Sequence, residues 1–134
     1  MGIARVLPED ATAAAAARRL VEEVVAQGAL REDALIVVSE LVANAWRHGE
    51  PPILLELSLD AEGHPPGSLL ISVSNRRGSD SRLVPRLMVG GRTDGLGGRG
   101  IGLVAALAQD WGWQEADGSL TVWAQVGPPR SLDR

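Results

Sequence analysis

Residues 39–49 read SELVANAWRHG, and at helical pitch they separate into two faces. Glu40, Asn44 and His48 fall four residues apart on one of these faces. Apolar residues of the same region share another side, namely Leu35, Val38, Val42 and Ala45. A carboxylate and a carboxamide one helical turn apart form a small oxygen-rich site. Such a site could hold a metal ion, orient a water molecule or accept a proton.

The chain changes to strand patterns after this helix. Gly49 is expected to end the helix, and the pair Pro51-Pro52 prevents its continuation. Apolar and polar residues then alternate over 53–59 and again over 69–75, on either side of a turn at 60–67 that contains two Gly and two Pro. These two strands are predicted to pair as an antiparallel hairpin.

The N-terminal part is predicted to serve packing rather than chemistry. Residues 1–7 form either a short strand or a loose start. A helix is expected to open at Pro8-Glu9-Asp10, because proline is tolerated in the first turn and acidic residues favour the positive end of the helix dipole. Apolar residues recur at helical spacing from Ala13 onward, and Gly28 is the expected stop. The next helix, which carries the opening stretch, is expected to begin at 31–33.

Periodicity is lost over residues 76–98. This segment holds five Arg, six Gly and one Pro, with one short apolar island at 83–89. An irregular segment of this length is uncommon inside a compact domain, and is usually functional or disordered. We therefore predict a long loop between the first strand pair and the rest of the chain.

The end of that segment leads into a glycine-rich helix start, GLGGRGIGL at 95–103. Glycines let backbone N–H groups approach a ligand closely, and a helix N-terminus adds partial positive charge, so phosphate is the natural guest. Arg99 could add a charged donor, and Arg92 could do so if the loop closes. A flexible loop before a glycine-rich helix explains the pattern equally well. It is not a P-loop, because no Gly-Lys-Ser/Thr follows, and it does not directly follow a strand as a dinucleotide fingerprint would.

The last part of the chain completes an α+β pattern. A helix follows from residue 99, and 111–115 and 121–126 are predicted to form a closing hairpin with its turn at Asp117-Gly118. The order of elements favours a two-layer sandwich, with helices on one face of a mainly antiparallel sheet. We expect a single domain over 1–134.

Composition limits the possible functions. A chain of 134 residues with 45% hydrophobic residues suits one globular core. The net charge of −4 argues against non-specific nucleic-acid binding, and the lack of cysteine excludes disulfides, thiolate nucleophiles and Cys-zinc sites. The longest apolar-looking run, 11–25, contains charged residues and is not a membrane span. A cytoplasmic protein without membrane contact is the expectation. The four Trp are expected mainly in the core or at its edge, with a partner surface as the alternative.

The order of these features resembles a known family. The chain resembles the Bergerat-fold ATP-binding domain of DNA gyrase, heat-shock chaperones, sensor histidine kinases and mismatch-repair proteins. The resemblance rests on four features in this order: a helix with Glu40 and Asn44, a strand ending in a polar residue, a long loop, and a glycine-rich helix start. Residues 39–49, followed by GGRGIGLV at 97–104, are most similar to the small actinobacterial anti-sigma-factor serine kinases. The resemblance covers about 8–126, nearly the whole chain.

This resemblance implies roles for residues by position. Glu40 matches the family's candidate general base, and Asn44 matches the residue that supplies an oxygen to Mg²⁺. Residues 76–98 correspond to the lid over the nucleotide, and Thr121 matches a threonine that helps to hold the adenine edge. His48 is expected to interact with the helix dipole rather than to act in catalysis. The residues implied at the phosphates are Gly98, Arg99, Gly100, Ile101 and Gly102.

One departure from the family lies at the end of the second predicted strand. The family normally has an Asp there, whose carboxylate accepts a hydrogen bond from the adenine amino group. This sequence has Asn75-Arg76-Arg77-Gly78 instead. An Asn oxygen can still accept that bond, but charge-assisted bonds are about twice as strong, so adenine affinity should fall. Asp80 lies nearby at a spacing that does not match.

The resemblance implies an ATP- and Mg²⁺-dependent transcription regulator. It would transfer the γ-phosphoryl group to a serine of an antagonist protein and would bind a sigma factor, as a homodimer and without direct nucleic-acid contact. Asn75 keeps a second hypothesis open, a degenerate nucleotide module that acts as a protein–protein switch. A third hypothesis is a divalent-metal site of Glu40, Asn44 and His48 that is unrelated to nucleotide.

Overall fold

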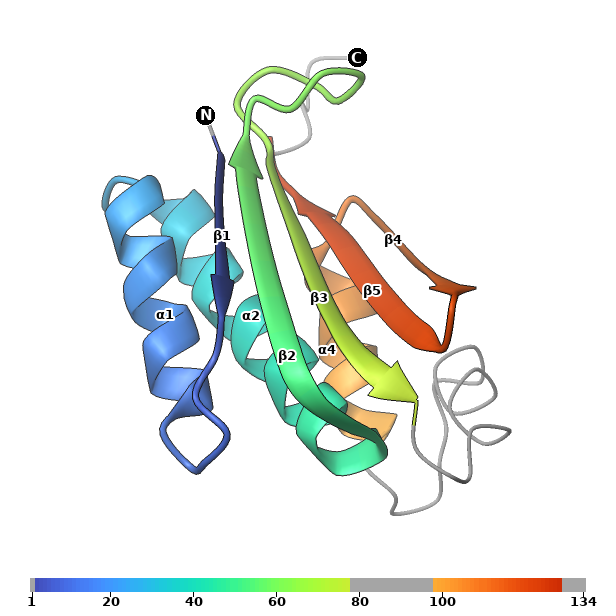
Figure 1. The fold of residues 1–134 in the computed structure, drawn as a ribbon. Coiled ribbons are helices and arrows are strands. Elements are labelled where there is room, and N and C mark those ends of the chain that lie inside the picture. The colour runs from blue at the N-terminus through green and yellow to red at the C-terminus, as the bar shows by residue number, and fades with distance from the viewer. Residues whose placement is uncertain (1, 78–97, 129–134) are drawn as a thin grey trace.

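The computed structural model of the protein describes residues 2–77 and 98–128. In chain order, the elements are β1 (Gly2–Val6), α1 (Ala13–Val24), α2 (Ala29–His48), β2 (Gly49–Leu59), β3 (Leu69–Arg77), α4 (Gly98–Leu107), β4 (Asp110–Ala116) and β5 (Ser119–Val126). They form two layers, a five-stranded antiparallel sheet and the helices that cover one of its faces (Figure 1). The predicted α+β sandwich is confirmed. The predicted loop at 76–98 lies outside the described residues, apart from its two ends.

The strands follow the order β1-β2-β3-β5-β4, and every neighbouring pair is antiparallel. Both predicted hairpins are confirmed, since β2 pairs with β3 and β4 pairs with β5. The turn of the second hairpin has φ angles of 53° at Asp117 and 77° at Gly118, the two positive values that a type I′ turn requires. The N-terminal residues form the edge strand β1 beside β2.

Several element boundaries differ from the prediction, and two of these differences have local reasons. α1 begins at Ala13 rather than at Pro8, because the Asp10 carboxylate accepts a hydrogen bond of 2.8 Å from the Thr12 N–H and fixes a turn ahead of the helix. β2 already begins at Gly49, before the proline pair. Its register with β3 is irregular between Glu50 and Leu54, where Pro51-Pro52 offers no N–H to the ladder.

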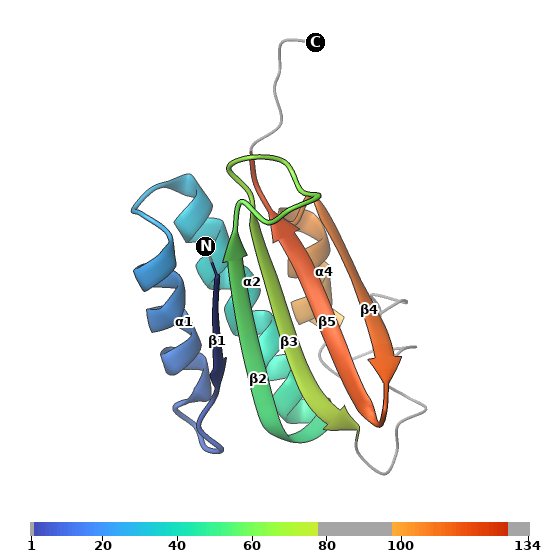
Figure 2. The same cartoon turned by 45° about the horizontal axis from the view of Figure 1, so that its top comes forward.

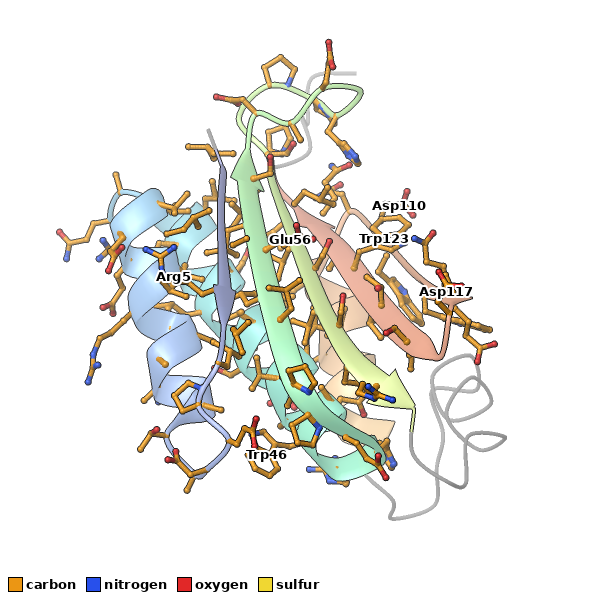
Figure 3. All side chains as sticks on the ribbon, viewed as in Figure 1. Arg5, Trp46, Glu56, Asp110, Asp117 and Trp123 are labelled. Atoms are coloured by element: carbon orange, nitrogen blue, oxygen red, sulfur yellow. The ribbon has the colours of Figure 1, made fainter. Side chains whose placement is uncertain are left out.

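The core lies between the helices and the inner face of the sheet. Alternate strand residues point inward and are almost fully buried, as with Leu55, Ile71 and Val122. The residues between them form the outer face, which no described helix covers (Figure 2). Glu56 on β2 and Trp123 on β5 both lie on this outer face (Figure 3). The direction of a strand side chain therefore decides whether it can take part in a site on the helix side.

The tryptophans divide between the two hypotheses. Trp111 and Trp113 pack against the core from β4, as predicted. Trp123 lies across Gly112, since a Cβ on this glycine would be 2.9 Å from the indole ring. Trp46 on α2 keeps 38% of its surface exposed. Among the described residues, no helix is long and apolar enough to cross a membrane.

Candidate functional site

The predicted site elements meet at one end of the molecule. α2 and β3 end there, and β5 and α4 begin there (Figure 1, lower end). α2 packs against both α4 and β3. The helix that carries Glu40 and Asn44, the strand end that carries Asn75, and the glycine-rich start of α4 are thus brought to one side of the fold.

Asn44 is the most informative side chain of this region. It is only 6% exposed, and no hydrogen bond joins its carboxamide to any residue in the described part of the chain. A buried polar group without a partner costs about 1–3 kcal/mol. This cost, and the freedom of an amide oxygen to coordinate a hard cation, fit a residue reserved for a ligand.

Glu40 lies one helical turn before Asn44 and is half-buried. Within the described ranges, no ion pair or hydrogen bond engages its carboxylate. The two residues therefore present free oxygens along one line of α2, as the spacing predicted. No cluster of three or more His, Asp or Glu that could hold a metal ion occurs in residues 2–77 and 98–128.

His48 and Arg47 lie in the last turn of α2. A cationic or partly cationic side chain at this position interacts favourably with the negative end of the helix dipole. This is the supporting position expected for His48. Arg47 is exposed and stands seven residues after Glu40, which is close to two full helical turns.

The glycine-rich stretch opens a helix as predicted. α4 begins at Gly98, so Gly98, Gly100 and Gly102 lie in its first turns. The first four N–H groups of a helix have no partner within it, which makes such a start a ready anion site. A Cβ on Gly102 would meet nothing within 4 Å, so the described residues leave space above this backbone.

Asn75 faces the helix side of β3 and is 5% exposed. Its amide nitrogen donates to the carbonyl oxygen of Arg76 at 2.6 Å. The side chain lies against Gly49, the residue that follows α2, because a Cβ there would be 1.9 Å from the Asn75 nitrogen. The φ angle of −127° at Gly49 is open to any residue, so glycine is needed for space rather than for backbone freedom. Sequence reasoning missed this contact between the end of α2 and the end of β3.

Thr121 is the one predicted site residue on a described strand that does not join this group. It pairs with Ser74, and their hydroxyl oxygens lie 2.9 Å apart on the outer face. The β5 residue opposite Asn75 is Leu120, which is 2% exposed. Adjacent strand residues point to opposite faces, so an alignment that is wrong by one residue assigns a role to a side chain on the other face of the sheet. The alternation of Leu120, Val122 and Ala124 is the sequence signal that could have shown that Thr121 faces outward.

The remaining predicted residues are only partly placed. Gly98, Arg99, Gly100 and Ile101 belong to the first turns of α4. Arg92, Asp80 and the lid segment lie outside the described residues. Arg76 is exposed on the outer face, opposite Glu50 in the β2–β3 register. The basic residue that directly follows Asn75 therefore does not face the helix side.

Comparison with known proteins agrees with this arrangement. A family model described as the histidine kinase-like ATPase domain matches residues 7–126. A search among curated protein sequences gave no significant match.

Solved structures share the fold at low sequence identity. One is the crystal structure of the RsbU and RsbW domains of Rv1364c from Mycobacterium tuberculosis, with a TM-score of 0.64 and 19% identity over 98% of this chain and 34% of that chain. Another is the SiaB-SiaC complex from Pseudomonas aeruginosa, with a TM-score of 0.60 and 15% identity over 92% of this chain and 88% of that one. The chain thus spans about a third of the first of these proteins.

Proposed function

The chain belongs to the histidine kinase-like ATPase domain family, and we propose that it binds ATP at the end of the molecule where α2, β3 and α4 meet. Asn44 carries this proposal, because it is buried, and no described residue offers its carboxamide a hydrogen bond. The start of α4 supplies N–H groups for the phosphates, through Gly98, Arg99, Gly100 and Ile101, and Gly102 leaves open space beside them. Asn75 supplies a neutral acceptor for the adenine amino group.

The residues present fit a magnesium ion at Asn44, whose amide oxygen is a ligand of the kind that Mg²⁺ accepts. When bound, the ion would be held by the Asn44 amide oxygen and would neutralise charge on the phosphates. Few protein ligands are expected, since Mg²⁺ usually keeps several waters and is held by one or two side chains together with the phosphates. A buried carboxamide at this position would be one of these few ligands.

The proposed reaction is phosphoryl transfer to a serine of a partner protein. Glu40 accepts the proton of the serine hydroxyl while the serine oxygen forms a bond to the γ-phosphorus. The bond between the γ-phosphorus and the oxygen of ADP breaks, and the electron pair of this bond leaves with ADP. The sequence motifs at 39–49 and 97–104 support an antagonist protein as the acceptor and a sigma factor as the regulated partner.

The transfer is tested with the whole chain, MgATP labelled in the γ-phosphate, and the antagonist proteins of the same source. We expect phosphoserine on one antagonist. Glu40→Gln should lower the transfer rate about 10²- to 10⁴-fold, because it removes the base but keeps the shape. The same variant should bind ATP as the wild type does in calorimetry. Transfer that survives in Glu40→Gln would remove Glu40 as the base.

A second candidate function is a nucleotide-family module that switches protein partners without turnover. Asn75 and its neighbour Leu120 favour it, since both are uncharged at the site where the base would bind. Partner binding that is unaffected by ATP, together with no heat on titration with millimolar MgATP, would favour this alternative over the kinase.

A further inference from the structure

A groove of about 530 Å³ runs between the start of α1 and the last turns of α2. Its lining includes the small side chains of Ala13, Ala14 and Ala43, and Ala13 is almost fully buried at the floor. Trp46 stands beside it and is one of the few large apolar side chains left exposed among the described residues, at 38% (Figure 3). An indole next to a floor of methyl groups is the kind of anchor that protein partners bury.

The groove adjoins the line of Glu40 on α2. Trp46 follows Glu40 by six residues, which places it about 9 Å further along the helix axis and about 120° around it. At the radius of the helix surface, about 5 Å, the path over the surface between the two residues is about 14 Å long. Four or five residues of extended chain cover this path at about 3.3 Å each. A segment with its anchor at Trp46 can therefore bring a hydroxyl to Glu40.

Two residues of opposite charge, Asp10 and Arg47, stand at the rim of the groove. Arg47 is exposed and has no ion pair with any described residue. Asp10 is held by the Thr12 hydroxyl and N–H, which keep the pKa of its carboxyl below the usual value and the group ionised at neutral pH. A segment with an apolar residue between a basic and an acidic one matches this rim.

We infer that this groove docks the acceptor segment of the protein substrate, through an apolar side chain four or five residues away from the hydroxyl that is phosphorylated. The inference rests on the proposed phosphoryl transfer, and it adds the recognition surface. A second copy of this chain is the competing occupant.

The test uses a series of serine peptides that carry no other charged or apolar side chain and contain one leucine each. From one peptide to the next, the leucine stands one position further from the serine. Binding is followed by calorimetry with MgATP present, and transfer is followed with labelled ATP. Burying the leucine should lower the dissociation constant about tenfold when it stands four or five residues from the serine. Trp46→Ala should abolish this optimum and leave ATP affinity unchanged.

Trp123→Ala is the matched control, because it removes a tryptophan from the outer face of the sheet, and it should keep the leucine optimum. Ala11→Trp, an exposed position, fills the groove and should abolish the optimum even if Trp46→Ala does not fold. A peptide that binds with this dependence but is not phosphorylated supports the groove and contradicts the transfer. Phosphorylation without a leucine optimum, or with one that Trp46→Ala leaves in place, overturns the groove and keeps the transfer.

If no peptide binds and none is phosphorylated, both proposals are overturned. Light scattering tests whether a second copy of this chain occupies the groove. A dimer that Trp46→Ala converts to a monomer, with peptide binding unchanged, would make the groove an interface between copies and would overturn docking of the acceptor.

Discussion

The helix half and the sheet half of the candidate site differ in how well a sequence motif locates their residues. On α2, Glu40 and Asn44 lie along the same line of the helix, as their spacing predicted, with free oxygens among the described residues. On the sheet, Asn75 faces the helices, whereas Thr121 faces away from them. A helix tolerates small errors of alignment, because residues three and four apart share a face, but a strand reverses direction at every residue. Motifs on strands therefore need the register before roles are assigned.

The largest effect is expected at Asn44 on the helix half. Asn44→Leu replaces a buried, unpartnered carboxamide by an apolar group of similar size, which should stabilise the nucleotide-free protein by about 1–3 kcal/mol. The same change should abolish the Mg²⁺ dependence of ATP binding, since no amide oxygen remains. Urea unfolding without nucleotide and calorimetry with and without Mg²⁺ measure the two effects. Asn44→Asp, which keeps an oxygen, is the control. A destabilised Asn44→Leu protein would mean that the carboxamide is satisfied within the fold.

The next effect links the two halves through Gly49. Gly49→Ala places a methyl group where the Asn75 amide lies, and overpacking of this kind costs about 1–3 kcal/mol. Gly102→Ala is the matched control, because a Cβ there meets nothing within 4 Å and alanine favours a helix by about 1 kcal/mol over glycine. Urea unfolding should therefore show opposite signs for the two variants. Equal stability of Gly49→Ala and the wild type would show that the Asn75 side chain can adopt another conformation at no cost.

The smallest effect is expected at Thr121 on the sheet half. Thr121→Val removes the hydroxyl contact with Ser74 and should cost about 0.5–1.5 kcal/mol of stability. ATP affinity should not change, because the hydroxyl lies on the outer face. Ser74→Ala breaks the same contact from the other side and should give a similar loss. A selective loss of ATP affinity in Thr121→Val, with Ser74→Ala unaffected, would place Thr121 at the nucleotide after all.

Sequence alone was sufficient for most of the fold, and for specific reasons. The alternation in β2, β3 and β5 and the Asp117-Gly118 turn are strong local signals, and they located both hairpins. The start of α1 was misplaced because the Asp10 turn competes with the helix. The contact of Gly49 with Asn75 could not be predicted, since it joins residues far apart in sequence through a space that only a glycine leaves open.

That the α2 face and the end of β3 form two halves of one nucleotide site is tested most directly by Asn75→Asp. Affinities of this variant and of the wild type are measured calorimetrically for MgATP and for MgITP, which has a keto group in place of the amino group. A charge-assisted bond in place of a neutral one should raise the affinity for MgATP about tenfold and should not raise that for MgITP. Equal changes for both nucleotides, or none for either, would contradict the placement of the base at Asn75.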